Sequence, residues 1–117
     1  MQEAVMATAR PTPVAVNRAL AQAGTHLATW RRLQQLTSDQ VADRAGVSRT
    51  TLHRLESGAG ASLENTLRVA RALGVMDLLV ASIDPYNSDV GRLRADEELP
   101  QRVRRPAQPR RRTGAEG

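Results

Sequence analysis

Five segments of the chain between residues 13 and 83 have the spacing of apolar residues that is typical of α-helices. In the first segment the apolar positions are three and four residues apart, as on one face of a helix. They are Val16, Leu20, Ala23, Leu27 and Trp30. The stripe keeps its phase through Gly24, so we expect one long helix from Pro13 to about Gln35. A break at Gly24-Thr25 is the alternative, because glycine weakens a helix interior.

Capping residues mark the starts and ends of these segments. The expected N-caps are Thr12, Thr37, Ser48 and Ser62, and the glycines expected just after helix ends are Gly46, Gly58 and Gly74. Pro13 fits the first helical position, where its missing N–H costs nothing. Thr37 and Gln40 have the spacing of a capping box, in which the threonine hydroxyl accepts a helical N–H and the glutamine reaches back to the cap. A last apolar segment covers residues 75–83.

The inward-facing positions that this pattern predicts are small or aliphatic. They are Val41, Ala42, Ala45, Val47, Leu52, Leu55, Leu63, Leu67, Ala70 and Leu73. Val47 falls in the turn between two helices, where we expect it to be a buried plug. Only two residues are aromatic, Trp30 and Tyr86, and no segment alternates apolar and polar residues as a strand does. These observations predict an all-α domain of five helices over residues 13–83.

Residues 41–56 have the organisation of a helix-turn-helix. A short helix containing Ala42 is followed by Gly46 in the turn, by Val47, and by a second helix capped by Ser48. Ala42 has to be small because the second helix crosses close to it. The outward positions of the second helix are Arg49, Thr50, His53 and Arg54.

From about Leu27 to Ile83 the chain resembles the phage-repressor/Cro-like family of helix-turn-helix domains, also called XRE-type. The residues that carry the resemblance are Leu36, Thr37, Val41, Ala42, Ala45, Gly46, Val47, Ser48, Leu52, Leu55, Glu56, Gly58, Leu73, Gly74 and Val75. The resemblance implies double-stranded DNA as the partner, with the helix over residues 49–57 in the major groove. It also implies a scaffold pair between Arg31 and Glu56. The chain departs from the family at Ser38, where glutamine is usual.

The resemblance and the outward positions together give nine candidate DNA-binding residues. They are Thr37, Ser38, Gln40, Ser48, Arg49, Thr50, Thr51, His53 and Arg54. The resemblance assigns base edges to Arg49, Thr50 and Arg54, and phosphates to residues at the N-termini of the two helices. Arg49 and Arg54 are about 140° apart around a helix, so they line opposite margins of one exposed face. Arginine can donate two hydrogen bonds to guanine, and a threonine methyl group can contact thymine.

Some of these residues also fit simpler roles. Arg49 and Arg54 fit ordinary solvated charges on a helix, and His53 fits a phosphate neighbour or a bystander. Trp30 shares its stripe with Leu27, which favours a core or interface anchor over a platform for stacking bases.

Charge is distributed unevenly along the chain. The formal net charge is +5, from 17 Lys+Arg against 12 Asp+Glu, and every basic residue is arginine. Residues 1–100 contain 11 arginines and 11 acidic residues, so the whole excess belongs to residues 101–117. We expect residues 1–12 to be a disordered N-terminus and residues 101–117 to be a flexible, disordered arginine-rich tail. This tail is either a solubilising end or an arm that strengthens binding to phosphates without choosing a sequence.

Residues 84–100 form an extension between the domain and the tail. Val90, Leu93 and Leu99 are interspersed there with charges of both signs. This pattern fits either a short helix that docks on a partner protein or dimer mate, or a tethered and partly ordered extension.

Several other classes of protein lack their characteristic residues here. The chain has no Cys and two isolated histidines, so we expect no disulfide and no metal site. We find no nucleophile–base pair, carboxylate dyad or phosphate-binding glycine loop at workable spacing, so we expect neither an enzyme nor a cofactor. With no apolar N-terminal segment and no long apolar run, we expect no signal peptide, no membrane span and a cytoplasmic location.

The sequence therefore predicts a sequence-specific transcriptional regulator, in the first place a repressor. We expect a homodimer on a two-fold symmetric operator. The candidate dimer interface is the segment over 75–83, with Met76, Leu79, Val80 and Ile83. The alternative is an antitoxin whose extension neutralises a toxin and whose helix-turn-helix represses its own operon.

Overall fold

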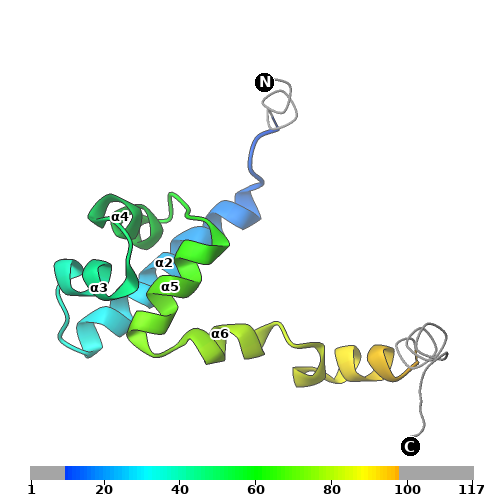
Figure 1. Ribbon diagram of the computed structural model, residues 1–117. Helices are drawn as coiled ribbons and strands as arrows, with labels where there is room; N and C mark the ends of the chain where they lie inside the picture. Colours follow the sequence, from blue (N-terminus) through cyan, green and yellow to red (C-terminus); the bar gives the residue numbers. More distant parts are fainter. Residues whose placement is uncertain (1–9, 98–117) are drawn as a thin grey trace, which may run out of the picture. The chain divides into compact units, whose positions relative to one another are not determined.

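A computed structural model describes residues 10–97, and this range is all-helical (Figure 1). The α-helices are α2 (Val14–Leu33), α3 (Ser38–Ala45), α4 (Arg49–Ser57), α5 (Leu63–Leu73) and α6 (Met76–Ser82). A one-turn 3-10 helix, η1 (Pro85–Asn87), follows, and residues 89–97 are helical as well. The described residues divide into two compact units, 10–77 and 78–97. The all-α prediction is confirmed, while the expectations for residues 1–9 and for the arginine-rich tail lie outside the described residues.

The first helix, α2, runs without a break through Gly24, as the phase of its apolar stripe predicts. Its start differs from the prediction. The backbone of Pro13 is extended (φ −59°, ψ 147°), and its carbonyl accepts hydrogen bonds from the N–H groups of Val16 and Asn17. Pro13 is therefore the N-cap and not the first helical residue, so the prediction that Thr12 caps this helix was wrong.

Gly24 lies where α2 crosses α4. A Cβ atom built on Gly24 would stand 2.6 Å from the carbonyl oxygen of Glu56 and closer still to that of Leu55. Any side chain would collide with the α4 backbone at such distances. The glycine is thus explained by close helix packing, and the helix remains intact around it.

The predicted helix-turn-helix is confirmed as α3, its turn and α4 (Figure 1). Thr37 caps α3 in a full capping box: the Gln40 N–H donates to Thr37 Oγ1 at 3.1 Å, and the Thr37 N–H donates to Gln40 Oε1 at 2.8 Å. Gly46 ends α3 in the left-handed conformation, with φ at 73°, which glycine adopts without strain. Ser48 caps α4 by accepting the N–H of Thr51 at 3.0 Å.

The core of the first unit lies among the helices α2, α3, α4 and α5. Its buried residues are Leu27, Val41, Ala42, Ala45, Leu52, Leu55, Val69, Ala70, Leu73 and Val75. Helix α2 packs on α4 and α5, and α3 also packs on both of them. Val47 is half-buried against this core, so the predicted plug is only partly covered.

Several apolar residues are more exposed than the sequence pattern suggests. Leu63, predicted to face inward, is 71% exposed because it is the first residue of α5 and precedes the turn that meets the core, where Val69 is fully buried. Trp30 is 39% exposed and is not a core residue. Val16, at 46% exposure, and Ala23 are exposed as well, because α2 turns Gly24, Leu27 and Ala28 toward the neighbouring helices and not the whole predicted stripe.

The predicted pair of Arg31 and Glu56 joins α2 to the end of α4. Arg31 Nε donates to Glu56 Oε2 at 2.8 Å, and Nη2 donates to Oε1 at 3.1 Å. Arg31 Nη1 also donates to the carbonyl of Leu36 at 3.2 Å. The hydrogen bonds to Glu56 raise the pKa of Arg31 above its ordinary value, against the opposing effect of burial. This bidentate pair is mostly shielded from solvent and fixes the geometry of α2 and α4, so the scaffold prediction is confirmed.

The described part of the second unit, residues 78–97, holds η1 and the helix over 89–97. Asp84 caps η1 by accepting the N–H of Tyr86 at 2.9 Å, and the Arg92 side chain donates to the carbonyl of Tyr86 at 2.6 Å. Ala95 is buried at 6% exposure. The extension thus contains the short helix that its sequence allows, and a docking role for it stays a prediction.

Among residues 10–97, no helix combines the length and the apolar character that a membrane crossing requires.

Candidate nucleic-acid interface

Helix α4 has one buried apolar side and one exposed polar side. Leu52 and Leu55 are 1% and 5% exposed and hold the helix on the core. The exposed residues include Arg49, Thr50, His53 and Arg54. These are the four outward positions that the sequence predicts, and the helical spacing puts the two arginines at the margins of the polar side.

The start of α4 lies next to the start of α3. Arg49 Nε is 3.1 Å from Asp39 Oδ1, and the two side chains are 67% and 71% exposed. Arg49 is the first residue of α4, and Asp39 is the second residue of α3. The first turns of the two helices therefore meet at the surface, where their N–H groups and the positive ends of their dipoles favour an anion.

Four of the predicted site residues at these helix starts already take part in caps: Thr37, Gln40, Ser48 and Thr51. Ser48 Oγ accepts the N–H of Thr51 and donates to Thr51 Oγ1 at 2.9 Å. Gln40 uses its side-chain oxygen for the Thr37 N–H, which leaves its amide nitrogen as the group that can donate to a ligand. Ser38 is half-buried. The caps thus hold these side chains in fixed positions around the first turns.

Arg54 is arranged differently from Arg49. Its Nη2 donates to the carbonyl of Ala59 at 3.3 Å, so the side chain is directed along the loop that follows α4. His53, next to it, borders a hollow of about 300 Å³ that Thr25 and Arg32 of α2 also line. The exposed side of α4 is therefore bordered by a carboxylate at its start and by a loop at its end.

Asp39 is the residue of this surface that sequence reasoning missed. Its neighbours Thr37, Ser38 and Gln40 are all among the predicted site residues, whereas a carboxylate is repelled by phosphates and so does not suggest DNA contact. Its partner Arg49 is ten residues away, on another helix. The pair could have been inferred from a simple pattern: an acidic residue lies in the first turn of one helix, and an arginine begins the next helix.

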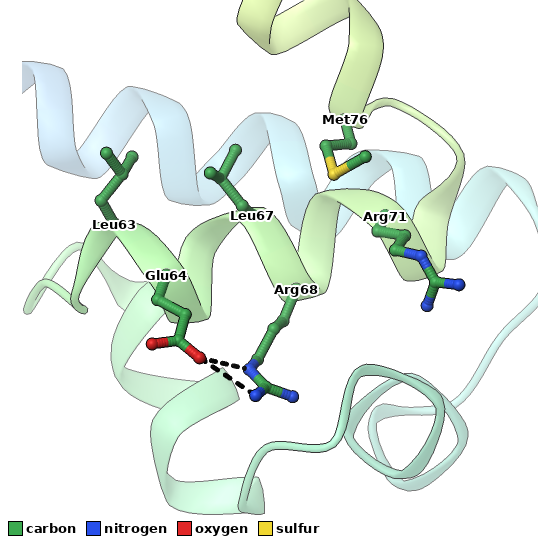
Figure 2. A pocket seen from close by; sticks show the side chains of 6 residues that line it. All are labelled: Leu63, Glu64, Leu67, Arg68, Arg71 and Met76. Atoms are coloured by element: carbon green, nitrogen blue, oxygen red, sulfur yellow. Dashed lines mark hydrogen bonds and ion pairs between the residues drawn. The ribbon is translucent and has the colours of Figure 1, made fainter.

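A hollow of about 520 Å³ lies along α5 (Figure 2). Five of its six lining residues belong to α5, and Met76 is the sixth. Figure 2 shows Leu63 and Leu67 on one side of α5 and the ion pair between Glu64 and Arg68 on the other, at 3.0 Å. The hollow is an open groove on one helix and includes none of the predicted site residues.

Within residues 10–97, no group of three or more His, Cys, Asp or Glu side chains is placed to hold a metal ion.

A capped short helix, a left-handed glycine turn and an exposed second helix held by two leucines define the helix-turn-helix class of DNA-binding domains. A family model described as a helix-turn-helix domain matches residues 22–83, just over half of the chain, and the protein belongs to this family. Membership agrees with the XRE-type resemblance of the sequence. No curated protein and no solved structure matches the chain.

Proposed function

We propose that the protein binds double-stranded DNA at specific sequences and regulates transcription, with α4 in the major groove. The observation that carries this proposal is the exposed polar side of α4, which begins with Arg49 and is held rigidly by Leu52 and Leu55. A major groove about 12 Å wide admits one α-helix. A helix that is fixed on its buried side can present the same side chains to every site, which sequence-specific recognition requires.

Bases would be read by the residues at the margins and start of α4. Arg49 and Arg54 can each donate two hydrogen bonds to guanine O6 and N7, and the Thr50 methyl group can contact thymine. We propose that the remaining predicted residues bind phosphates and fix the position of the domain. These are Thr37, Ser38, Gln40, Ser48, Thr51 and His53. Contacts of this kind position a protein on DNA without choosing the sequence.

We propose a homodimer, because α6 exposes apolar side chains that a second copy can cover. Leu79 and Val80 of α6, and Ile83 just after it, are 37%, 51% and 81% exposed. Met76, which the sequence analysis placed in the interface, packs instead against the core of its own copy. A two-fold dimer places two copies of α4 in successive turns of the major groove, roughly 34–36 Å apart. Repression is the simplest mode of regulation for such a dimer, since a protein seated on its site blocks the access of others.

Selection of bound sequences from a random double-stranded DNA pool tests this function with the full-length protein. The expected result is one enriched motif that contains guanine and is repeated as an inverted pair about one helical turn apart. Binding without any enriched motif would contradict sequence-specific recognition. A motif without the inverted repeat would contradict the dimer alone.

An antitoxin is the second candidate function. It is supported by the apolar side chains that the helix over 89–97 exposes, since Val90 is 65% and Leu93 is 62% exposed. A toxin could cover them while α4 represses the operon. A toxin-like protein encoded in the neighbouring reading frame that binds this helix would favour the antitoxin over a stand-alone repressor.

A further inference from the structure

We propose that Asp39 is a positioning residue that holds the Arg49 side chain in the orientation needed to recognise guanine. The inference rests on the proposed DNA-binding function and adds a residue that determines its specificity. It starts from the ion pair between the first turns of α3 and α4, in which Arg49 Nε is 3.1 Å from Asp39 Oδ1.

The ion pair uses the part of the guanidinium that guanine does not need. A guanidinium group carries five N–H donors, and four of them belong to the two terminal nitrogens. The carboxylate contact at Nε is an ion pair, and within the described range 10–97 no residue forms a hydrogen bond with Arg49. Both terminal nitrogens therefore remain able to donate to O6 and N7 of one base.

Orientation is the main benefit that such a pair can provide. Both side chains are more than 60% exposed, and exposed ion pairs contribute little to folding stability. Arginine loses considerable rotamer freedom when it makes a two-point contact. A carboxylate that already restricts the guanidinium before DNA binds lowers the conformational entropy that the arginine loses on binding. Only bases that the guanidinium can reach from this restricted position gain affinity in this way.

The charge of Asp39 also separates base contact from phosphate contact. A carboxylate beside Arg49 repels the phosphate backbone and cancels much of the attraction that the arginine alone would have. This makes Arg49 a poor phosphate clamp but leaves its directional hydrogen bonds to a base edge intact. Arg54 has no carboxylate within ion-pair distance among the described residues, and its Nη2 donates to the Ala59 carbonyl. The two arginines should thus differ in their dependence on Asp39.

The test compares Asp39→Ala with Asp43→Ala in the full-length protein. Both changes remove one negative charge from an exposed position of α3, and Asp43 forms no ion pair within residues 10–97. The general gain in attraction to phosphates is therefore similar in both variants. Affinity is measured for the site enriched by wild-type selection, for its single-base variants, and for random DNA. Thermal unfolding of each variant verifies that it is folded, and Asp39→Asn replaces Asp39→Ala should the alanine variant be unstable.

The positioning role predicts a loss of preference at one base pair. In Asp39→Ala, discrimination for guanine at the base pair read by Arg49 should fall about tenfold, which is within the range of one two-point arginine contact. Affinity for random DNA should stay equal to that of Asp43→Ala, and the preference at the other base pairs should persist. Because discrimination compares two sequences bound by one variant, a change in folding stability alone would not move it.

Two results would overturn the positioning role. If Asp39→Ala keeps the full preference of Asp43→Ala, Asp39 does not orient Arg49. If Asp39→Ala instead binds the selected site more tightly than Asp43→Ala does, Asp39 restrains Arg49 from DNA and acts as an inhibitory contact. Failure of the wild-type protein to enrich any motif would overturn the proposed function and this inference with it.

Discussion

At the scale of single residues, the contact between α2 and α4 depends on the missing side chain at position 24. The Gly24 Cα faces the carbonyl oxygens of Leu55 and Glu56, where an added Cβ has no room. Backbone oxygens at a helix end cannot move aside as a flexible side chain can. Gly24 therefore sets how closely α4 approaches the long helix beneath it.

We predict that Gly24→Ala destabilises the protein by about 1–3 kcal/mol, the usual cost of overpacking a close contact. In an uncrowded helix the same substitution would stabilise by about 1 kcal/mol, so the sign of the effect identifies the cause. Chemical denaturation of the variant measures it. Ala23→Gly, at the exposed neighbouring position, serves as the control and should cost about 1 kcal/mol. A stabilising Gly24→Ala would refute the close contact.

Local features of single residues could be predicted from the sequence. Of the contacts across the fold, the pair of Arg31 and Glu56 was predicted only because the family resemblance implies it. The capping box of Thr37 and Gln40 depends on residues three apart in the chain, and its spacing alone reveals it. The contacts of Gly24 and the pairing of Asp39 with Arg49 depend on the angle at which two helices cross. No periodicity in the sequence encodes that angle.

At the scale of elements, the pair of Arg31 and Glu56 fixes α4 on α2. The two side chains are 14% and 15% exposed, so water screens their attraction far less than on the surface. Glu56 directly follows Leu55, one of the two leucines that bury one side of α4. It thereby contributes to the rigidity of the helix that we propose to enter DNA.

We predict that Glu56→Gln lowers the free energy of unfolding by about 1.5–3 kcal/mol, because it replaces charged hydrogen bonds to a shielded guanidinium. Glu64→Gln is the matched control. Glu64 pairs with Arg68 at 3.0 Å, but its side chain is 73% exposed. The control should cost less than about 1 kcal/mol. Equal losses in the two variants, measured by denaturation, would contradict a special role for the Arg31 pair.

The order and limits of the helices were largely predictable from apolar spacing and caps. The exceptions lie at helix ends: Pro13 stays outside α2, and Leu63 is exposed at the start of α5. Helical periodicity identifies which residues share a side, but not how far along the helix the neighbouring elements extend. Packing also decides which side of a helix is buried: α2 buries Gly24, Leu27 and Ala28, and Trp30 of the predicted stripe stays exposed.

At the scale of the whole molecule, the placement of charge matters more than its sum. Residues 1–100 have equal numbers of arginines and acidic residues, so the part that contains the helix-turn-helix has no excess of positive charge. Attraction to DNA in this part depends on where individual arginines lie. Arg49 lies at the start of α4, beside a carboxylate, whereas Arg71 lies on α5 along the open groove of Figure 2.

The central claim, that the exposed side of α4 reads DNA sequence, is tested most directly by comparing Arg49→Ala with Arg71→Ala. Each variant loses one positive charge, and binding is measured to the selected site and to its single-base variants. We predict that Arg49→Ala weakens binding to the selected site by about 1–3 kcal/mol and removes the preference at one base pair. Arg71→Ala should retain every preference. An Arg49→Ala variant that weakens binding equally for all sequences would contradict base reading by α4.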